Sequence, residues 1–225
     1  MAPRVDPVAS DTELPAHTSV VVVGGGIIGT STAFFLARKG IPVVLCEKGH
    51  IAGEQSSRNW GWCRKMGRDP REIPLSIEAL RLWGEMNTLT EAETGFRQCG
   101  IVYLCKTPEE MAKREAWLEH ARPYQLDSRL LSREEAAQVL PGLTGEWQGA
   151  LYTPSDGRGE PQQAAPAIAE AARRHGASIL TQCAVRGIET QGGRVAAVVT
   201  EKGRIACAGC ELLAEVMLRH GIGKH

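Results

Sequence analysis

Hydrophobic residues in the first fifty positions follow two patterns, a continuous run and a helical repeat. Residues 19–23 are a serine followed by four valines, which is typical of a parallel strand covered on both faces. Residues 27–39 place apolar side chains at helical spacing and stop at Gly40, and residues 41–46 are a second apolar run. The pattern therefore predicts a strand, a helix and a strand in succession, a βαβ unit.

The apolar stretch 19–37 has nearly the length of a membrane span, which is the competing interpretation. Three consecutive glycines, Gly24 to Gly26, divide it into a β-branched half and a helix-like half, so a strand, a turn and a helix are favoured and no transmembrane segment is expected. Residues 1–18 carry proline and acidic residues without the apolar core of a signal peptide, and we expect a flexible tail there.

Helical and strand-like patterns continue to residue 200. A helix is predicted over 72–94, and Pro161 is expected to open another that runs to His175. Capping sequences begin helices at Thr107 and after Leu131. Strands are predicted at 100–105, 149–152, 177–183, 184–189 and 195–200, and the buried face of the helix 72–94 is predicted to consist of Leu75, Ala79, Leu82, Trp83 and Met86.

Composition adds limits to this α/β pattern. Hydrophobic residues make up 43% and charged residues 23%, which is typical of a globular protein, and 26 basic residues balance 26 acidic ones. The balanced charge therefore gives no overall electrostatic attraction for nucleic acid. The odd count of 7 cysteines, scattered along the chain, favours free thiols and a cytoplasmic location. Cys207 and Cys210 have the spacing of a redox or metal-binding dithiol, but we interpret this spacing as coincidental. The 6 histidines show no metal-ligand spacing, so no metal is expected.

The turn of the βαβ unit has the spacing G-x-G-x-x-G. Gly24 permits the tight bend, Gly26 lets a pyrophosphate approach the backbone, and Gly29 lets helix and strand pack closely. Glu47 ends the second strand, where an acid accepts hydrogen bonds from an adenosine ribose. Strand, turn, helix and acid together predict an ADP-binding cradle, and the acid disfavours NADP.

The stretch EQSSRNWGWCRKMGRDPR, residues 54–71, is unusually basic and carries two tryptophans. Its cations are predicted to make a local positive region for a reduced cofactor and a carboxylate substrate. The alternative is a merely basic loop anchored by two buried indoles. The cations in question are Arg58, Arg64, Lys65, Arg68 and Arg71.

Together these motifs, with VVLCEKG at 43–49 and SDGRGEP at 155–161, resemble the FAD-dependent family of D-amino-acid oxidase, glycine oxidase and sarcosine oxidase. The resemblance implies a Rossmann-like FAD-binding βαβ domain with part of an α+β substrate domain. Beyond the tail at 1–18, which its composition predicts, the resemblance implies FAD-binding segments at 19–95 and 154–225 and a partial substrate domain at 96–153. The FAD-binding residues it implies are Gly24, Gly26, Ile27, Ile28, Gly29, Glu47, Lys48, Gln55, Ser56, Ser57, Arg58, Asn59, Trp60, Gly61 and Val185.

The implied reaction is hydride transfer from the amine-bearing carbon of an amino acid or amine to flavin N5, giving an imine that water hydrolyses, with oxygen or a quinone as electron acceptor. No catalytic base can be named. Residues 51–69 contain no histidine, so non-covalent FAD is expected, with Cys63 a structural thiol. Asp156 and Glu160 are interpreted as turn and helix-start residues more readily than as an acid–base pair.

After Cys207 the sequence departs from the family pattern, and residues 210–225 are expected to form one amphipathic helix in a shortened chain. Two alternatives to an active flavoenzyme stay open. One is a non-catalytic flavin- or nucleotide-binding remnant, and the other is an NAD-dependent dehydrogenase.

Overall fold

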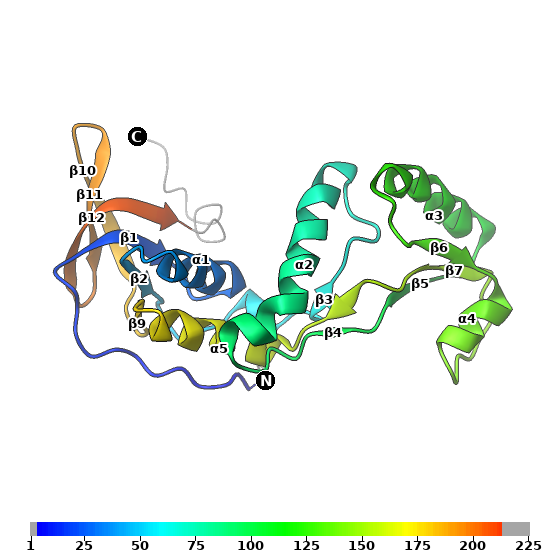
Figure 1. The fold of residues 1–225 in the computed structure, drawn as a ribbon, viewed down its shortest axis with the longest axis horizontal. Coiled ribbons are helices and arrows are strands. Elements are labelled where there is room, and N and C mark those ends of the chain that lie inside the picture. The colour runs from blue at the N-terminus through cyan, green and yellow to red at the C-terminus, as the bar shows by residue number, and fades with distance from the viewer. Residues whose placement is uncertain (1–3, 213–225) are drawn as a thin grey trace. The chain divides into compact units, whose positions relative to one another are not determined.

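A computed structural model describes residues 4–212 and divides the chain into two compact units (Figure 1). The first unit contains residues 1–60, 88–94 and 160–225, and the second contains 61–87 and 95–159. Each unit has its own sheets and core, so each is described separately.

The first unit is built on a six-stranded sheet in the order β10-β11-β12-β1-β2-β9. Parallel pairing joins β12, β1, β2 and β9, and β10, β11 and β12 are antiparallel. The bounds of its strands are β1 His17–Val23, β2 Val43–Cys46, β9 Ser178–Leu180, β10 Val185–Gln191, β11 Arg194–Thr200 and β12 Gly203–Leu212.

Two helices pack together in this unit, α1 (Ile27–Arg38) and α5 (Pro161–Arg174). The ring of Phe34 on α1 lies 5.7 Å from the ring of His175, which caps the end of α5. The core cluster of this unit includes Val21 on β1, Val44 on β2 and Leu180 on β9, and Leu14 packs against it. The predicted βαβ unit and the α/β fold class are confirmed.

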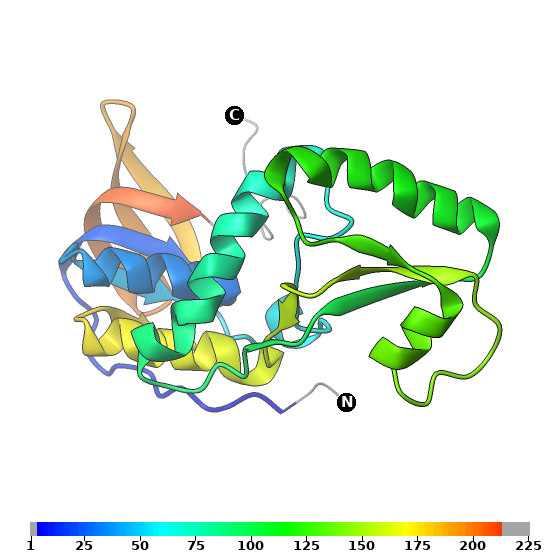
Figure 2. The same cartoon turned by 45° about the vertical axis from the view of Figure 1, so that its right-hand side comes forward.

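The second unit contains two small antiparallel sheets, in the orders β5-β7-β6 and β3-β8-β4. Figure 2 shows α3 lying along the first of these sheets. Met66, Ile101 and Leu151 form a buried cluster in this unit. The strand bounds are β3 Trp62–Cys63, β4 Arg97–Gln98, β5 Ile101–Cys105, β6 Arg129–Leu131, β7 Gly149–Thr153 and β8 Gly157–Arg158.

The helices that the capping sequences predicted begin where expected. In α3 (Pro108–Ala121) the Thr107 hydroxyl accepts from the Glu110 amide, and in α4 (Arg133–Val139) Ser132 and Glu135 form a reciprocal capping box. Helix α2 (Ile73–Thr90) runs from the second unit into the first, and short 3-10 turns occupy η1 Gln55–Ser57, η2 Pro70–Glu72 and η3 Arg122–Tyr124.

The predicted buried face of α2 is only partly right. Leu75 is 73% exposed and Ala79 is also exposed, whereas Met86 is buried. The other buried apolar side chains are Ile73 and Leu80, seven residues apart, so the buried stripe is rotated from the predicted one. An apolar-rich helix offers more than one such stripe, and tertiary packing selects between them.

Three predicted boundaries differ from the structure. Residues 61–87 were predicted within the FAD-binding segment 19–95, but they group with the second unit, where Trp62 and Cys63 pair with Arg158 and Gly157. The predicted tail 1–18 overlaps β1, which begins at His17, and its Ser10 and Asp11 carry hydrogen bonds. The predicted helix 210–225 is replaced up to Leu212 by β12, and its remainder lies outside the described residues.

Candidate functional site

The glycine turn between β1 and α1 is tied to the end of β2. Gly24 has a φ of 107°, a conformation that favours glycine, and its amide donates to the Cys46 carbonyl at 2.8 Å. The Gly25 amide donates to Oε2 of Glu47 at 2.7 Å. A Cβ on Gly26 would lie 2.9 Å from the Ser56 hydroxyl, so the turn leaves no room for a side chain there. The glycine spacing is therefore a steric requirement of this turn.

Glu47 is 8% exposed, and both of its carboxylate oxygens accept backbone hydrogen bonds. Oε1 accepts from the Gly49 amide at 2.7 Å, opposite the bond from Gly25 to Oε2. Its backbone is fixed to the end of β9 and to the segment that follows, because its amide donates to the Leu180 carbonyl and its carbonyl accepts from the Cys183 amide, each at 2.9 Å. A carboxylate has about four acceptor sites, so two further hydrogen bonds can still be accepted.

The N-terminus of α1 carries no acidic residue in its first turn and no side-chain cap of its own. Instead the Ile27 amide donates to the hydroxyl of Ser56, 29 residues later, at 2.9 Å. The other amides of a first helical turn have no acceptor within the helix, and the helix dipole places positive charge beside them. This end of α1 therefore has the chemistry that binds phosphate.

The segment that supplies Ser56 is fixed by short-range contacts. The side-chain Nδ2 of Asn59 donates to the Ser56 carbonyl at 2.9 Å, and the hydroxyl of the buried Ser57 donates to the Glu54 carbonyl at 3.2 Å. Gln162 on α5 donates through Nε2 to the Ser57 carbonyl at 3.0 Å. Trp60 is 79% exposed and Trp62 39% exposed, so the alternative of a loop anchored by two buried indoles is wrong.

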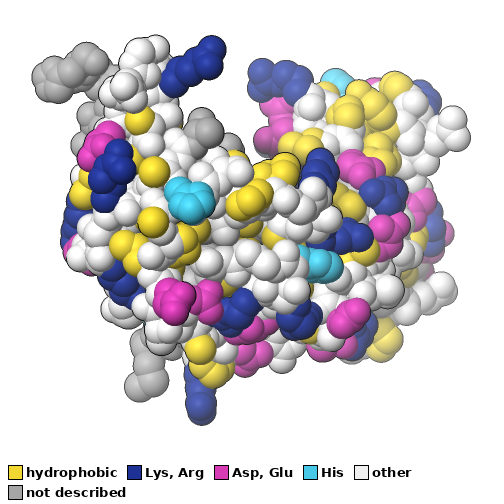
Figure 3. Space-filling model, turned by 60° about the vertical axis from the view of Figure 1, so that its left-hand side comes forward, with side chains coloured by type: hydrophobic (Ala, Val, Ile, Leu, Met, Phe, Trp, Pro, Cys, Tyr) yellow, Lys and Arg dark blue, Asp and Glu magenta, His cyan; other side chains and the backbone are white. Residues whose placement is uncertain are grey.

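The predicted positive region is not a cluster of unpaired cations. Arg58 lies 3.5 Å from Glu54, which also pairs with Lys48 at 3.3 Å. In the second unit Arg68 pairs with Glu72, Arg71 with Asp69, and Lys65 with Asp156. Arg64 lies over the rings of Trp62 and Tyr103. Figure 3 shows charges of both signs interspersed over one face.

The remaining predicted residues are distributed as follows. Ile28 is 65% exposed on α1 and Gly29 is buried in it, Gln55 opens η1, and Val185 begins β10 and packs against the core. Gly61, with a φ of 69°, belongs to the second unit. Sequence reasoning did not find Gly25, Gly49 and Gln162. Gly25 could have been noticed within its glycine triplet, whereas the other two contacts leave no sequence signal.

Asp156 is fully buried and fixes the segment 65–66 within the second unit. Its two oxygens accept from the amides of Lys65 at 2.9 Å and Met66 at 3.1 Å, and the Lys65 ammonium lies 3.9 Å away. Burial raises the pKa of the Asp156 carboxyl, and the hydrogen bonds from Lys65 and Met66 act against that rise. These contacts support the structural interpretation of Asp156 over an acid–base role.

Replacing Asp156 by alanine is expected to lower the free energy of unfolding by about 3 kcal/mol, because two buried amides lose their acceptor and the Lys65 ammonium loses its ion-pair partner. Urea denaturation of the variant would measure this loss. Glu146→Ala, which removes an exposed carboxylate in the same unit, is the matched control and should change stability by less than about 0.5 kcal/mol. Equal midpoints for the two variants would contradict the anchoring role.

The thiol of Cys63 is partly buried. Burial raises the pKa of its thiol to about 12, so at neutral pH the nucleophilic thiolate is scarce. Six cysteines are described as free thiols, and of these Cys99 is exposed. The side chain of Cys210 lies outside the described residues.

Alkylation of the folded protein with iodoacetamide at pH 8 is expected to label Cys99 and to leave Cys63 unmodified. Peptide mass spectrometry would assign the labelled positions, and labelling in denaturant serves as the control in which both react. Rapid labelling of Cys63 in the native protein would contradict this assignment.

Other candidate sites add little. Within residues 4–212 no group of three or more His, Cys, Asp or Glu side chains is placed to hold a metal ion. A hollow of about 540 Å³ is lined by residues 11–16 and Ser178 and includes none of the predicted cofactor-binding residues. Among the described helices, none combines the length and apolar character that crossing a bilayer requires.

The glycine turn, α1 and Glu47 define an α/β protein with a βαβ unit of the dinucleotide-binding type. The model of the family described as "FAD dependent oxidoreductase" (DAO) matches residues 19–222, and the chain belongs to this family. This match disfavours the NAD-dependent alternative.

Similar proteins include an enzyme subunit, a regulatory subunit and a solved enzyme. The chain is 30% identical to sarcosine oxidase subunit beta of Rhizobium meliloti over 208 residues, which is 88% of this chain and 49% of that one. It is 28% identical to the mitochondrial pyruvate dehydrogenase phosphatase regulatory subunit of Mus musculus, covering 88% of this chain and 23% of the mouse protein.

The structure of L-amino acid deaminase from Proteus myxofaciens in complex with anthranilate superposes with a TM-score of 0.91 at 34% identity, covering 97% of this chain and 50% of the deaminase. The family thus includes oxidoreductases of amino acids and amines, and this chain spans between about a quarter and a half of these three relatives.

Proposed function

We propose that this chain binds FAD non-covalently through its first unit and belongs to an enzyme that oxidises the CH–NH group of an amino acid or a secondary amine. One observation carries the proposal: Glu47 and Ser56, from two different segments, are hydrogen-bonded to the same glycine turn, at 2.7 Å and 2.9 Å. Three segments separated in sequence thereby meet where an ADP moiety would be held.

Each segment has a proposed task. The first-turn amides at Ile28 and Gly29 bind the pyrophosphate, while the Ile27 amide holds Ser56 beside it. Gly24 permits the bend, and Gly26 lets the pyrophosphate approach the backbone. Glu47 uses its remaining acceptor sites for the adenosine ribose hydroxyls, with Lys48 alongside, and Val185 contacts the adenine. The residues that follow the ribityl chain and the flavin ring are Gln55, Ser56, Ser57, Arg58, Asn59, Trp60 and Gly61.

Bound in this way, FAD supplies an acceptor at flavin N5 for the hydride that leaves the amine-bearing carbon. The chain's own contribution is to hold the cofactor and fix its orientation. The proposed substrate class follows from relatives named as sarcosine oxidase and L-amino acid deaminase. Oxygen or a quinone would reoxidise the flavin, and the proposed location is the cytoplasm, an inference from the scattered cysteines.

A second candidate is a flavin-binding module without catalysis. The similarity to a protein named as a phosphatase regulatory subunit supports it. Both candidates require the same cofactor site, so they differ only in turnover.

An absorption spectrum followed by anaerobic addition of amines distinguishes the two. The enzyme proposal expects a yellow protein whose flavin absorbance is bleached by glycine, sarcosine or an amino acid. A yellow protein that none of these bleaches, and that dithionite reduces normally, would favour the non-catalytic module. A folded protein that cannot be loaded with FAD would contradict both.

A further inference from the structure

The N-terminal segment covers the outer edge of the six-stranded sheet. Strand β9 is the last strand in the sheet order and pairs with β2 on one side. On its other side the Asp11 amide donates to the Ile179 carbonyl at 2.8 Å, and the Ile179 amide donates to Oδ2 of Asp11 at 2.6 Å. An edge strand presents such groups at every second residue.

The next outward-facing residue, Thr181, is matched by Ser10. The Thr181 amide donates to the Ser10 hydroxyl at 3.1 Å, and the same hydroxyl lies 3.3 Å from the Thr181 carbonyl. Lys202 also donates to this carbonyl at 2.9 Å. Two consecutive residues of the N-terminal segment thus provide partners for four backbone groups along this edge.

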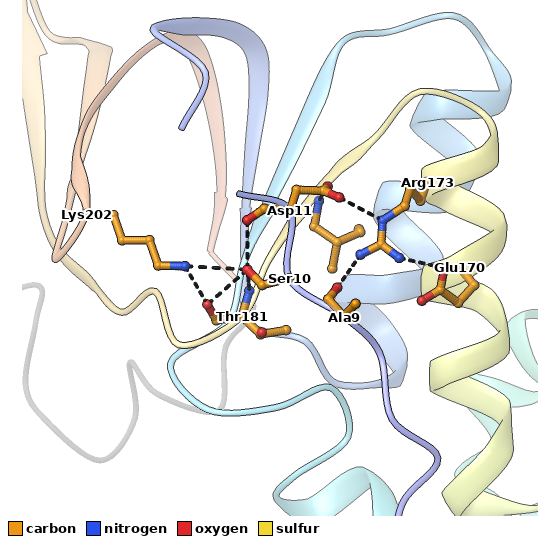
Figure 4. A network of polar contacts seen from close by, with 8 residues as sticks. Ala9, Ser10, Asp11, Glu170, Arg173, Thr181 and Lys202 are labelled. Carbon is orange, nitrogen blue, oxygen red and sulfur yellow. Dashed lines mark hydrogen bonds and ion pairs between the residues drawn. The ribbon is translucent and has the colours of Figure 1, made fainter. Parts of the chain in front are cut away.

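Charged side chains fix the segment in place. The Arg173 guanidinium on α5 donates to Oδ1 of Asp11 at 3.0 Å and to Glu170 at 2.6 Å, and it also contacts the Ala9 carbonyl (Figure 4). Asp11 and Arg173 are both less than one-third exposed, so water screens this pair less than an ion pair on the open surface.

Both ends of the segment lead to residues of the proposed cofactor site. Between Ile179 and Thr181, the Leu180 carbonyl accepts from the Glu47 amide at 2.9 Å, and just beyond them the Gln182 amide donates to Gly49 at 3.0 Å. At the other end the Asp6 amide donates to the Gln162 carbonyl at 3.1 Å, and the Gln162 side chain holds Ser57.

We propose that residues 6–11, here called the N-terminal strap, position Glu47 and the Ser56–Ser57 segment for the cofactor. Ser10 and Asp11 are positioning residues, because they fix the edge of β9, and the end of β9 in turn fixes the backbone of Glu47. The proposal deepens the proposed function, since it concerns the same site. Its structural part, the ordering of the Glu47 loop, holds whether or not FAD binds.

The test compares amide hydrogen exchange in the full chain without added FAD. In the double variant Ser10→Ala/Asp11→Ala, exchange at Ile179 and Thr181 is expected to accelerate about tenfold, because each loses a hydrogen bond to the strap. The proposal further expects faster exchange at Gly25, Glu47 and Gly49, and a dissociation constant for FAD raised about fivefold or more. Glu13→Ala, an exposed carboxylate beside the strap, is the matched control.

Two results would overturn the proposal. In one, exchange accelerates at Ile179 and Thr181 while Gly25, Glu47 and Gly49 keep the control rates, so that the strap is only an edge cover. In the other, exchange at Ile179 and Thr181 does not change. Ser10→Ala alone, which removes the partner of the Thr181 amide and leaves Asp11 in place, provides the comparison at Thr181 if the double variant does not fold. A wild-type chain that fails to bind FAD refutes the proposed function, and the exchange rates still decide the role of the strap.

Discussion

Gly26→Ala is expected to weaken FAD binding by about a hundredfold, the equivalent of roughly 3 kcal/mol of charge-assisted hydrogen bonding to the pyrophosphate. The added Cβ would lie 2.9 Å from the Ser56 hydroxyl, which accepts the Ile27 amide, so the methyl group displaces Ser56 and occupies the phosphate approach. Fluorescence titration of FAD with the purified variant measures the loss.

Gly187→Ala is the matched control for this substitution. Gly187 lies on β10 in the same unit, and a Cβ built there meets no atom within 4 Å. The control should therefore bind FAD as the wild type does. A Gly26→Ala variant that binds FAD with wild-type affinity would show that no phosphate approaches this turn.

Glu47→Gln is expected to have the second largest effect, on both stability and cofactor affinity. The carboxylate accepts two backbone amides at 2.7 Å, and a carboxamide would turn its NH2 group toward one of these donors. We expect the free energy of unfolding to fall by about 2 kcal/mol and the FAD dissociation constant to rise at least about tenfold, since hydrogen bonds to a charged group are worth roughly 1.5–3 kcal/mol.

Urea denaturation and FAD titration measure these two effects, and Glu54→Gln is the control. Glu54 is 59% exposed and pairs with Lys48 and Arg58 at the surface, so its neutralisation should cost less than about 1 kcal/mol. If Glu47→Gln and Glu54→Gln behave alike, Glu47 does not organise the turn.

Local chemistry explains which parts of this fold the sequence predicted. The glycine turn needs a positive φ at Gly24 and an absent side chain at Gly26, and both requirements are visible in the residue types. Helix starts at Thr107 and Ser132 depend on side chains within three residues of the cap. Such features involve neighbours in sequence, so a pattern can reveal them.

The features that the sequence did not predict depend on partners far along the chain. Asp156 accepts from the amides of Lys65 and Met66, which precede it by 91 and 90 positions. Asp11 binds Ile179, which follows it by 168 positions. The strands β3, β4 and β8 have two residues each, too short for any periodicity, and they exist only because they pair with one another. The basic stretch 54–71 suggested a positive field because its acidic partners could not be assigned from spacing.

Equilibrium titration of the folded chain with FAD, followed by visible absorbance and by competition with ADP, tests the central claim most directly. The account predicts saturable binding of one FAD per chain, displacement by ADP, and a flavin that denaturation releases intact. A chain with a native circular dichroism spectrum that binds no FAD at saturating concentration, or that retains flavin covalently after denaturation, would contradict it.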